Sequence, residues 1–305
     1  SYNVPRVSIV EKEVIYRSKI YFTPLRSATE IDAEAVQKIV SQEYKAAGMK
    51  PEDLSTGAVI ITGETARKQN ANEVLAALSD FAGDFVVATA GPDLESVLAG
   101  KGAGAAELSR KTEKIVANLD IGGGTTEVAI MSLGGIVYSH AVRTAGDQMD
   151  LDIIEFVRKN KNLLIGENAA EEIKKRIGTA IMPKDKANEM TMKIKGRDLL
   201  SGTPRETVIT ESQIATALAQ TVTKIVDTVR QALELTPPEL SADIADLGIA
   251  MTGGGSLLRG LDAAIRAATG LPAFLVDNPL ACVACGSGKM LSSLDKNKHI
   301  LQTMY

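Results

Sequence analysis

The chain has 305 residues, of which 45% are hydrophobic and 24% are charged, the balance of an ordinary globular protein with room for two domains. Its net charge of −4 and the absence of a long Lys/Arg run exclude general nucleic-acid binding. No apolar run approaches the roughly 20 residues of a membrane-spanning helix, and the polar segment after Ser1 has no signal-peptide character, so we expect a cytoplasmic chain.

Short strands and helices are predicted to alternate in the first third of the chain. Period-two alternation within residues 1–25, as in Val14 and Tyr16, predicts edge-forming antiparallel strands. Asp32 is placed to cap a helix that ends near Gly48. Further segments are predicted as strands at 58–62 and 85–89, and as helices at 63–67, 72–81 and 92–106. This alternation predicts the α/β class, with a parallel or mixed sheet covered by helices.

A glycine-rich turn, Asp120–Thr126, lies between the strand-like runs Ile115–Leu119 and Glu127–Met131. The pattern indicates a hairpin whose turn exposes backbone N–H groups, since glycine permits positive φ and close approach. Such a turn can wrap a phosphate, and Asp120 is placed to hold a metal-bound water. An ordinary glycine hairpin is the alternative. The segment lacks the Lys of a Walker loop and does not open a helix as a dinucleotide fingerprint does.

A second glycine cluster spans Gly248–Gly260 and has the pattern of a strand, a glycine turn and a helix. Ser256 is placed to cap that helix. Glycines at such a turn let a flat ring or a phosphate lie against the backbone. Two glycine turns, each after a buried strand, suggest two similar lobes that close on one nucleotide.

The rest of the chain is predicted to be mostly helical around a small subdomain. A strand at 135–142 precedes helices that begin at Gly146 and cover 167–177. Residues 183–209 are charged and carry short strand-like runs, which predicts a small appended subdomain. Thr210–Gln213 forms a capping box that opens a long helix, whose apolar stripe is typical of a core helix.

Three polar features have ordinary structural explanations. Glu171 and Lys174 lie three residues apart on one helix face, and this spacing alone favours a salt-linked surface pair. His140 is interpreted as a strand surface residue without a catalytic partner. The pair Cys282 and Cys285 lacks a second cysteine pair or suitably spaced histidines, so we interpret it as small residues in a tight helix packing, with no metal.

The two glycine segments resemble the second phosphate loop and the adenosine motif of the actin, heat-shock protein and sugar-kinase ATPases. From about residue 115 to 295 the chain resembles the bacterial actin MreB family, which sets rod shape. The segments that carry this resemblance are Asn162–Glu167, Gly196–Leu199, Thr236–Ile244 and Thr252–Asp262.

Residues 1 to about 115 resemble a different family, EutA, which comprises reactivating factors of ethanolamine ammonia-lyase. This resemblance rests on Ile60–Ala66 and Phe81–Gly100. Because the two resemblances meet close to the glycine hairpin, we interpret the chain as a hybrid of the two patterns.

The resemblance implies an actin-like ATPase fold, with two lobes whose mixed sheets are covered by helices. The lobes are expected at 1–117 and 118–305, with a small inserted subdomain at about 178–210. The resemblance places a first phosphate hairpin at the start of that fold, and we expect this hairpin to be missing here. In addition, Ala90–Pro92 reads Ala-Gly-Pro where bacterial actins carry Glu-Glu-Pro, so the glutamate that orients the attacking water is not at that position. We therefore expect an ATPase with weak binding and slow or absent hydrolysis, whose catalytic residues are unknown.

The ligand contacts that the resemblance implies are those of ATP or ADP with Mg²⁺. Asp120 would sit near Mg²⁺ through water, while Glu171 and Lys174 would hold ribose and adenine. The β- and γ-phosphates would be contacted by Gly122, Gly123, Gly124, Thr125 and Thr126. The adenosine would pack against Gly253, Gly254 and Gly255.

The function that the longer resemblance implies is a MreB-type cell-shape protein that self-associates as a filament or dimer. The membrane-contact loop of MreB falls in the part replaced by the EutA-like segment, so no membrane contact is expected from this chain. The alternative is a EutA-like reactivase with ethanolamine ammonia-lyase as its partner. A sugar kinase is a third possibility, but the sequence has no extended substrate domain.

Overall fold

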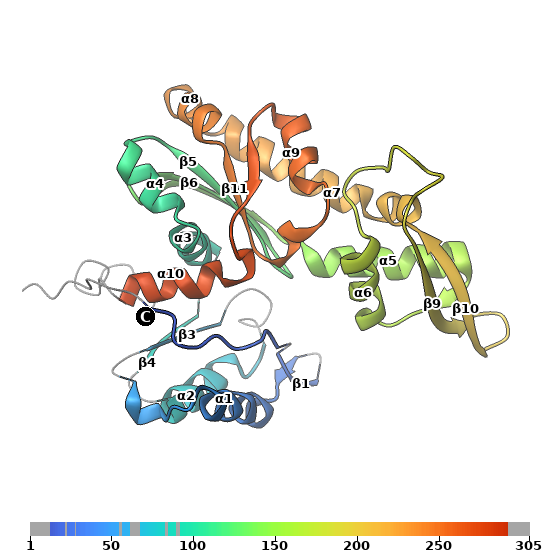
Figure 1. Cartoon of the computed structure of the whole chain (residues 1–305), viewed down its shortest axis with the longest axis horizontal. Helices are drawn as coiled ribbons and strands as arrows, with labels where there is room; N and C mark the ends of the chain where they lie inside the picture. The colour runs from blue at the N-terminus through green and yellow to red at the C-terminus, as the bar shows by residue number, and fades with distance from the viewer. Residues whose placement is uncertain are drawn as a thin grey trace, which may run out of the picture. The chain divides into compact units, whose positions relative to one another are not determined.

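The computed structural model describes residues 13–291 except 22, 28, 55–56, 62–67, 83–84 and 90–91. The chain separates into two compact units, one formed by residues 1–91 with 286–305 and the other by residues 92–285 (Figure 1). The sequence suggested a lobe boundary at residue 117. The division falls earlier because the helices between residues 92 and 112 pack on the sheet that begins at Val116.

The first unit contains two small sheets and two helices. Strand β1 (Leu25–Ser27) pairs antiparallel with β2 (Glu30–Ile31), and β3 (Gly57–Ile61) pairs parallel with β4 (Phe85–Thr89). The helical segments are α1 (Ala33–Ala47), the 3₁₀ helix η1 (Pro51–Asp53) and α2 (Ala71–Ala82). Its core is a cluster of aliphatic side chains from these elements: Ile31, Ile61, Ala71, Val74, Leu75 and Leu78.

Helix α1 begins and ends as its sequence predicts. The amide of Ala35 donates to Asp32 Oδ1 at 3.0 Å, and Gly48 closes the helix with φ of 69°. The strands expected before Leu25 are wrong for the described residues 13–21, which have no strand partner. Val14 and Ile20 are 69% and 71% exposed there, because no second strand covers them. The strand pairs expected before residue 13 and the helix at 63–67 lie outside the described residues.

A five-stranded mixed sheet is the centre of the second unit. Its order is β12-β11-β5-β6-β7, with β11 parallel to β5 and β12, and with β5, β6 and β7 antiparallel in turn. The strands are β5 (Val116–Ile121), β6 (Thr126–Ser132), β7 (Gly135–Val142), β11 (Ile249–Thr252) and β12 (Ala273–Leu275). The predicted strand–glycine–strand hairpin is confirmed as β5 and β6.

Helices cover both faces of this sheet, which explains why β5 is buried along its whole length. On one face α4 packs with Val116, Ala129 and Met131. The opposite face carries the larger core, to which β5 contributes Leu119 and Ile121. The helices of this unit are α3 (Pro92–Gly102), α4 (Ala105–Thr112), α5 (Gly146–Lys161), α6 (Glu167–Ile177), α7 (Glu211–Glu234), α8 (Pro238–Leu247) and α9 (Leu261–Thr269), and α10 (Cys282–Leu291) begins in it.

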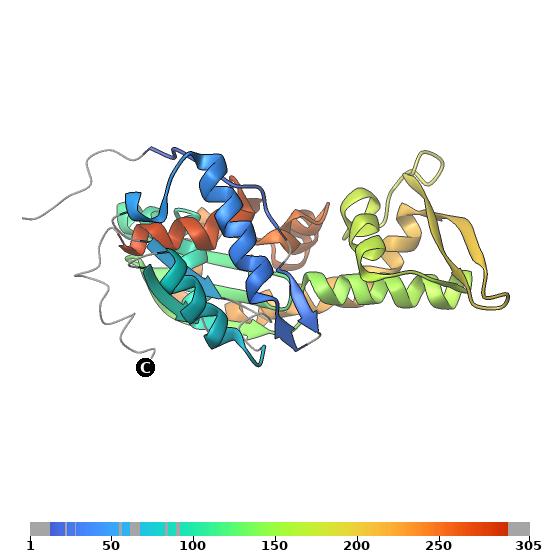
Figure 2. The same cartoon turned by 90° about the horizontal axis from the view of Figure 1, so that it is seen from below.

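The segment 183–209, which is predicted to form a small appended subdomain, contains a β-hairpin. Strands β9 (Thr191–Asp198) and β10 (Pro204–Thr210) pair antiparallel, and the short β8 (Leu163–Leu164) joins them at β9. In Figures 1 and 2 the hairpin lies beside α5 and α6, at the end of this unit away from the five-stranded sheet. The capping box of α7 is also confirmed, with Gln213 N donating to Thr210 Oγ1 at 3.4 Å.

Two local predictions in this unit are wrong. The helix expected at 92–106 is two helices, because Gly104 adopts φ of +82° between α3 and α4. Ser256 caps no helix: its hydroxyl donates to the Gly253 carbonyl at 2.6 Å, inside the 3₁₀ helix η3 (Gly254–Leu257). Helix α9 instead begins after Gly260 without a side-chain cap. A second 3₁₀ helix, η4 (Pro279–Ala281), precedes α10.

No helix within the described ranges combines the length and apolar character that crossing a bilayer requires.

Candidate functional site

The two glycine segments meet at the ends of neighbouring strands. Parallel pairing of β11 with β5 sets Thr252 beside Asp120, so both glycine turns leave the same edge of the sheet. A Cβ atom at Gly253 would lie 2.5 Å from Asp120 Oδ1 and would overlap the Ile121 carbonyl. A Cβ at Gly255 would overlap the Ile121 side chain. Glycine is therefore the residue that lets the second turn close onto the first.

The first glycine turn is shaped differently from its prediction. Positive φ angles occur at Gly253 and at other glycines, but not at the three glycines of residues 122–124. Close approach is what requires glycine here, because a Cβ at Gly123 would lie 2.9 Å from Asp147 Oδ1. The Gly123 carbonyl accepts from the Asp147 amide at 2.8 Å, and the Gly122 carbonyl accepts from the Gly146 amide at 3.1 Å. The first turn of α5 is thus docked on the glycine turn.

Two buried carboxyl groups lie on the α3 side of the sheet, at this same edge. Asp120 is 4% exposed and accepts from Thr252 Oγ1 at 3.0 Å. Glu127, its cross-strand partner, is 2% exposed and accepts from Ser96 Oγ at 2.8 Å. The other carboxyl oxygen of Glu127, Oε1, has no hydrogen-bond partner in the described part of the chain. A buried carboxyl with a free oxygen is a polar group for which a ligand, water or ion can supply the missing contact.

Burial raises the pKa of both carboxyl groups. Loss of hydration and the charge of Glu95 raise the pKa of Asp120 to about 7, although the hydrogen bond from Thr252 opposes the shift. The same two causes raise the pKa of Glu127 to about 8, opposed by hydrogen bonds from Ser96 and Thr125. Near neutral pH the pair therefore holds protons that a nearby cation would displace.

Lys174 reaches from α6 to the first turn of α5. Its Nζ donates to the Gly146 carbonyl at 2.9 Å and pairs with Asp150 Oδ2 at 2.7 Å. Burial raises the pKa of Asp150, while the bond from Lys174 acts in the opposite direction. Glu171 pairs with Lys175 at 2.7 Å instead. The salt-linked pair that spacing favoured for Glu171 and Lys174 is therefore wrong.

The residues implied by the resemblance divide into two groups. Asp120, the turn glycines and residues 253–255 are brought together, and Lys174 lies one contact away through Gly146. Thr125 is buried, and Thr126 donates its hydroxyl to the Thr144 carbonyl at 2.7 Å, which uses its single donor. No contact described for Glu171 joins it to either glycine segment.

Several polar residues of the site were missed by the sequence analysis. Glu95 and Ser96 come from α3, and Asp147 and Asp150 from the first turns of α5. Only Glu127 carried a visible signal, since it is the one acid in the apolar run Thr126–Met131. The predicted helix after Pro279 is confirmed as α10, in which Cys282 is buried and Cys285 is exposed.

The donor set fits a phosphate with a magnesium ion better than a metal held by protein alone. Asp120 and Glu127 offer carboxyl oxygens, the ligands that Mg²⁺ prefers. Among the described residues there is no group of three His, Cys, Asp or Glu side chains that could hold a metal by itself. Mg²⁺ commonly takes one or two carboxylates and completes its shell with phosphate oxygens and water.

Comparison with known proteins finds a similar solved structure and a matching family. The crystal structure of MreB5 of Spiroplasma citri bound to ADP is similar, with a TM-score of 0.71 and 32% identity, covering 91% of this chain and 80% of that one. A family model described as ethanolamine utilisation protein EutA matches residues 1–228. The chain belongs to the actin-like ATPase superfamily, and within it to the EutA and MreB families. The predicted actin-like fold is confirmed.

Curated relatives in the MreB family match a shorter part of the chain. The cell shape-determining protein MreB of Escherichia coli is 48% identical over 177 residues, which are 58% of this chain and 50% of that protein. The cell shape-determining protein Mbl of Bacillus subtilis is 44% identical over 178 residues, 58% of this chain and 53% of that protein. The chain spans about half the length of these relatives. The EutA match continues to residue 228, past the point near 115 where the motifs placed its end.

Proposed function

We propose that this chain binds an adenine nucleotide with Mg²⁺ at the paired glycine segments. The observation that supports this proposal is the fit of Gly253 and Gly255 against Asp120 and Ile121, which brings two bare backbone turns to one edge of the sheet. The solved relative MreB5 is bound to ADP. Amide groups of the first turn would bind the phosphates, and residues 253–255 would leave room for the adenosine.

In this proposal each polar side chain has one task. Bound Mg²⁺ would neutralise phosphate charge, with Asp120 oriented toward it by Thr252 through the 3.0 Å hydrogen bond. Lys174 holds the first turn of α5 against the glycine turn through the Gly146 carbonyl. Glu127 Oε1 would accept a hydrogen bond from water near the phosphate. We expect slow hydrolysis, because Ala90 and Gly91 cannot supply the carboxylate that the resemblance places there.

We propose further that the nucleotide-bound chain self-associates as a MreB-type cell-shape protein. This proposal is supported by the relatives called cell shape-determining proteins, at 44% and 48% identity. Sedimentation with ATP and Mg²⁺, with calorimetry on the same preparation, tests both parts. We expect ATP binding and ATP-dependent pelleting. Binding without pelleting would overturn the filament role alone, and absence of binding would overturn the nucleotide role.

A second function is favoured by one specific observation, the EutA family match over residues 1–228. In that role the chain would be an ATP-dependent reactivase of ethanolamine ammonia-lyase. Mixing the chain and ATP with lyase that has been inactivated by a damaged cobalamin separates the two roles. Recovery of lyase activity without pelleting would replace the filament function by the reactivase function. Pelleting without recovery supports the filament function.

A further inference from the structure

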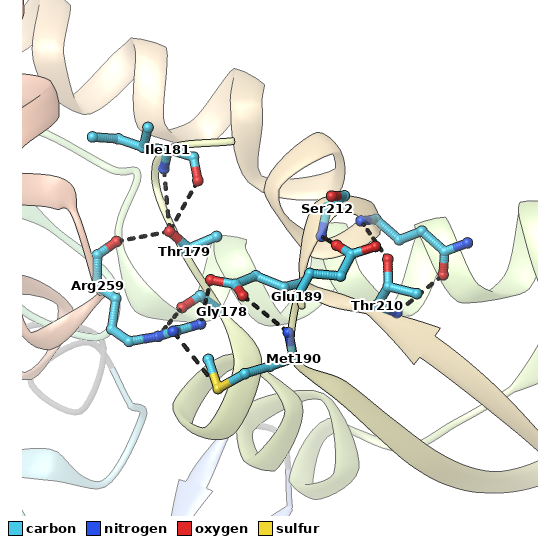
Figure 3. A network of polar contacts seen from close by, with 10 residues as sticks. Gly178, Thr179, Ile181, Glu189, Met190, Thr210, Ser212 and Arg259 are labelled. Atoms are coloured by element: carbon cyan, nitrogen blue, oxygen red, sulfur yellow. Dashed lines mark hydrogen bonds and ion pairs between the residues drawn. The ribbon is translucent and has the colours of Figure 1, made fainter. Parts of the chain in front are cut away.

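Arg259 lies near the end of the second glycine segment, and it joins three stretches of chain that are distant in sequence (Figure 3). Its Nε donates to the Gly178 carbonyl at the end of α6, at 3.1 Å. Its terminal nitrogen pairs with Glu211 Oε1 at the start of α7, at 2.9 Å. Its own carbonyl accepts from the Ala180 amide at 2.8 Å. A planar guanidinium suits this position because it directs several donors at fixed angles, which a lysine cannot do.

The partners of Arg259 extend the network to the base of the β9–β10 hairpin. Glu211 accepts from the Met190 amide through its second oxygen at 3.2 Å. Glu189, next in the chain to Met190, accepts from the Ser212 amide at 2.7 Å. Figure 3 shows these contacts, which link into one network because Glu189 is adjacent to Met190 and Ser212 is adjacent to Glu211. Glu189 and Met190 are thereby bonded to the first turn of α7. The start of the same segment is bonded to Arg259 through Ala180.

Helix α6 connects this network to both glycine segments. Lys174 bonds to the Gly146 carbonyl, and the Gly146 amide bonds to Gly122 in the first glycine turn. The Gly178 amide donates to the Lys174 carbonyl at 3.0 Å. Gly178 also packs against the second glycine segment, since a Cβ atom at Gly178 would lie 3.1 Å from Leu258 Cδ1. A movement of either glycine segment therefore also displaces contacts of α6, besides the direct contact between the two segments.

We propose that Arg259 is a positioning residue that couples ligand binding at the glycine segments to the segment Thr179–Ser212. This inference rests on the proposed nucleotide binding. A nucleotide between the two segments fixes Gly253–Leu258 relative to α6, and Arg259 passes that restraint to Glu211 and Met190. The occupied site would thus reduce local opening at the base of the β9–β10 hairpin.

Amide hydrogen exchange with and without ATP and Mg²⁺ tests this coupling in the full chain. The reporters are the amides of Ala180, Met190 and Ser212, each of which donates within the network. In the wild type we expect ATP to slow their exchange by at least about fivefold. In R259M the slowing should disappear, although calorimetry still detects ATP binding. The matched control is R176M, since Arg176 makes an exposed pair with Glu172 on α6 and should leave the slowing unchanged.

Each outcome decides the inference. If ATP still slows amide exchange in R259M, the inference is overturned. It is also overturned if the wild type binds ATP but its amide exchange is not slowed. The proposed nucleotide binding survives both results. A wild type that binds no ATP removes the proposed function and the coupling together. If R259M does not fold, E211Q replaces it, because the amide keeps the shape of Glu211 and loses the charge that faces Arg259. E211Q is then expected to weaken the slowing, and unchanged slowing in E211Q overturns the inference.

Discussion

Gly253 lies directly against the carboxyl group of Asp120, close enough that a Cβ atom would sit 2.5 Å from Oδ1. The two residues are separated by more than 130 positions in the sequence, and the parallel pairing of β11 with β5 brings them together. Gly253 also adopts φ of +80°, a backbone conformation that residues other than glycine rarely adopt. Two independent constraints therefore fix glycine at this position.

The first prediction separates these two constraints. G253A should destabilise the chain by more than about 2 kcal/mol, because strain at positive φ adds to a collision with backbone that cannot move aside. G270A is a control for positive φ alone, since Gly270 has φ of +73° with ψ of 1° and nothing within 4 Å of its Cβ position, and we expect a cost of about 1 kcal/mol. Chemical denaturation measures both. Equal losses would show that the contact with Asp120 contributes nothing.

The second prediction concerns the glycine turn itself. G123V should abolish ATP binding by calorimetry while the chain stays folded, because the nearest atom to its Cβ belongs to the movable Asp147 side chain. G135V, at the first residue of β7, where the nearest atom is the Ser132 carbonyl at 3.7 Å, should bind ATP like the wild type. Unchanged affinity in G123V would contradict the phosphate-binding assignment of residues 122–124.

Local patterns predicted much of the second unit. The β5–β6 hairpin, the capping box at Thr210 and the strand–turn pattern before Gly253 are signals within a few adjacent residues, and each appears in the structure. The reason for glycine in the first turn was predicted only in part. Its φ angles are ordinary, and the close neighbour, Asp147, comes from a helix that no local pattern connects with the turn.

Long-range polar partners could not be predicted in the same way. Spacing favoured a pair of Glu171 with Lys174, but Lys174 finds Asp150 across two helices at 2.7 Å. Likewise Glu127 bonds to Ser96, which lies in the helix predicted at 92–106, and nothing in the local sequence connects that helix with Glu127. The strands expected near Val14 failed for a related reason, since period two describes a strand only where a second strand is present to pair with it.

The third prediction follows from the pair of Lys174 and Asp150, whose side chains are both mostly buried. K174M should destabilise the chain by about 2 kcal/mol at pH 8, because the Asp150 carboxylate loses its cation in a site of low hydration. The loss should shrink as the pH falls and Asp150 takes up a proton, since burial already raises the pKa of this group. K175M, which removes an exposed partner of Glu171, should cost less than about 0.5 kcal/mol. A pH-independent loss in K174M would exclude Asp150 as the cause.

The fourth prediction concerns Glu127, whose pKa rises from its ordinary 4.5 to about 8 in the folded chain. The folded state then binds a proton more tightly than the unfolded state. The contribution of Glu127 to stability is therefore fully present below about pH 4.5 and is lost as the pH rises toward 8. Between pH 5.5 and 8.5 the wild type should lose stability relative to E127Q, by on the order of 3 kcal/mol.

Denaturant unfolding of the ligand-free chain at several pH values measures that difference directly. E155Q is the control, because Glu155 is an exposed carboxylate whose pKa is lowered by its bond to Lys159, so it stays ionised throughout the range. Adding ATP and Mg²⁺ should make the unfolding free energy of the wild type depend less steeply on pH, since a cation near Asp120 and Glu127 favours their ionised forms. If the unfolding free energies of the wild type and of E127Q depend equally on pH, Glu127 is already ionised at pH 5.5 and another contact satisfies its free oxygen.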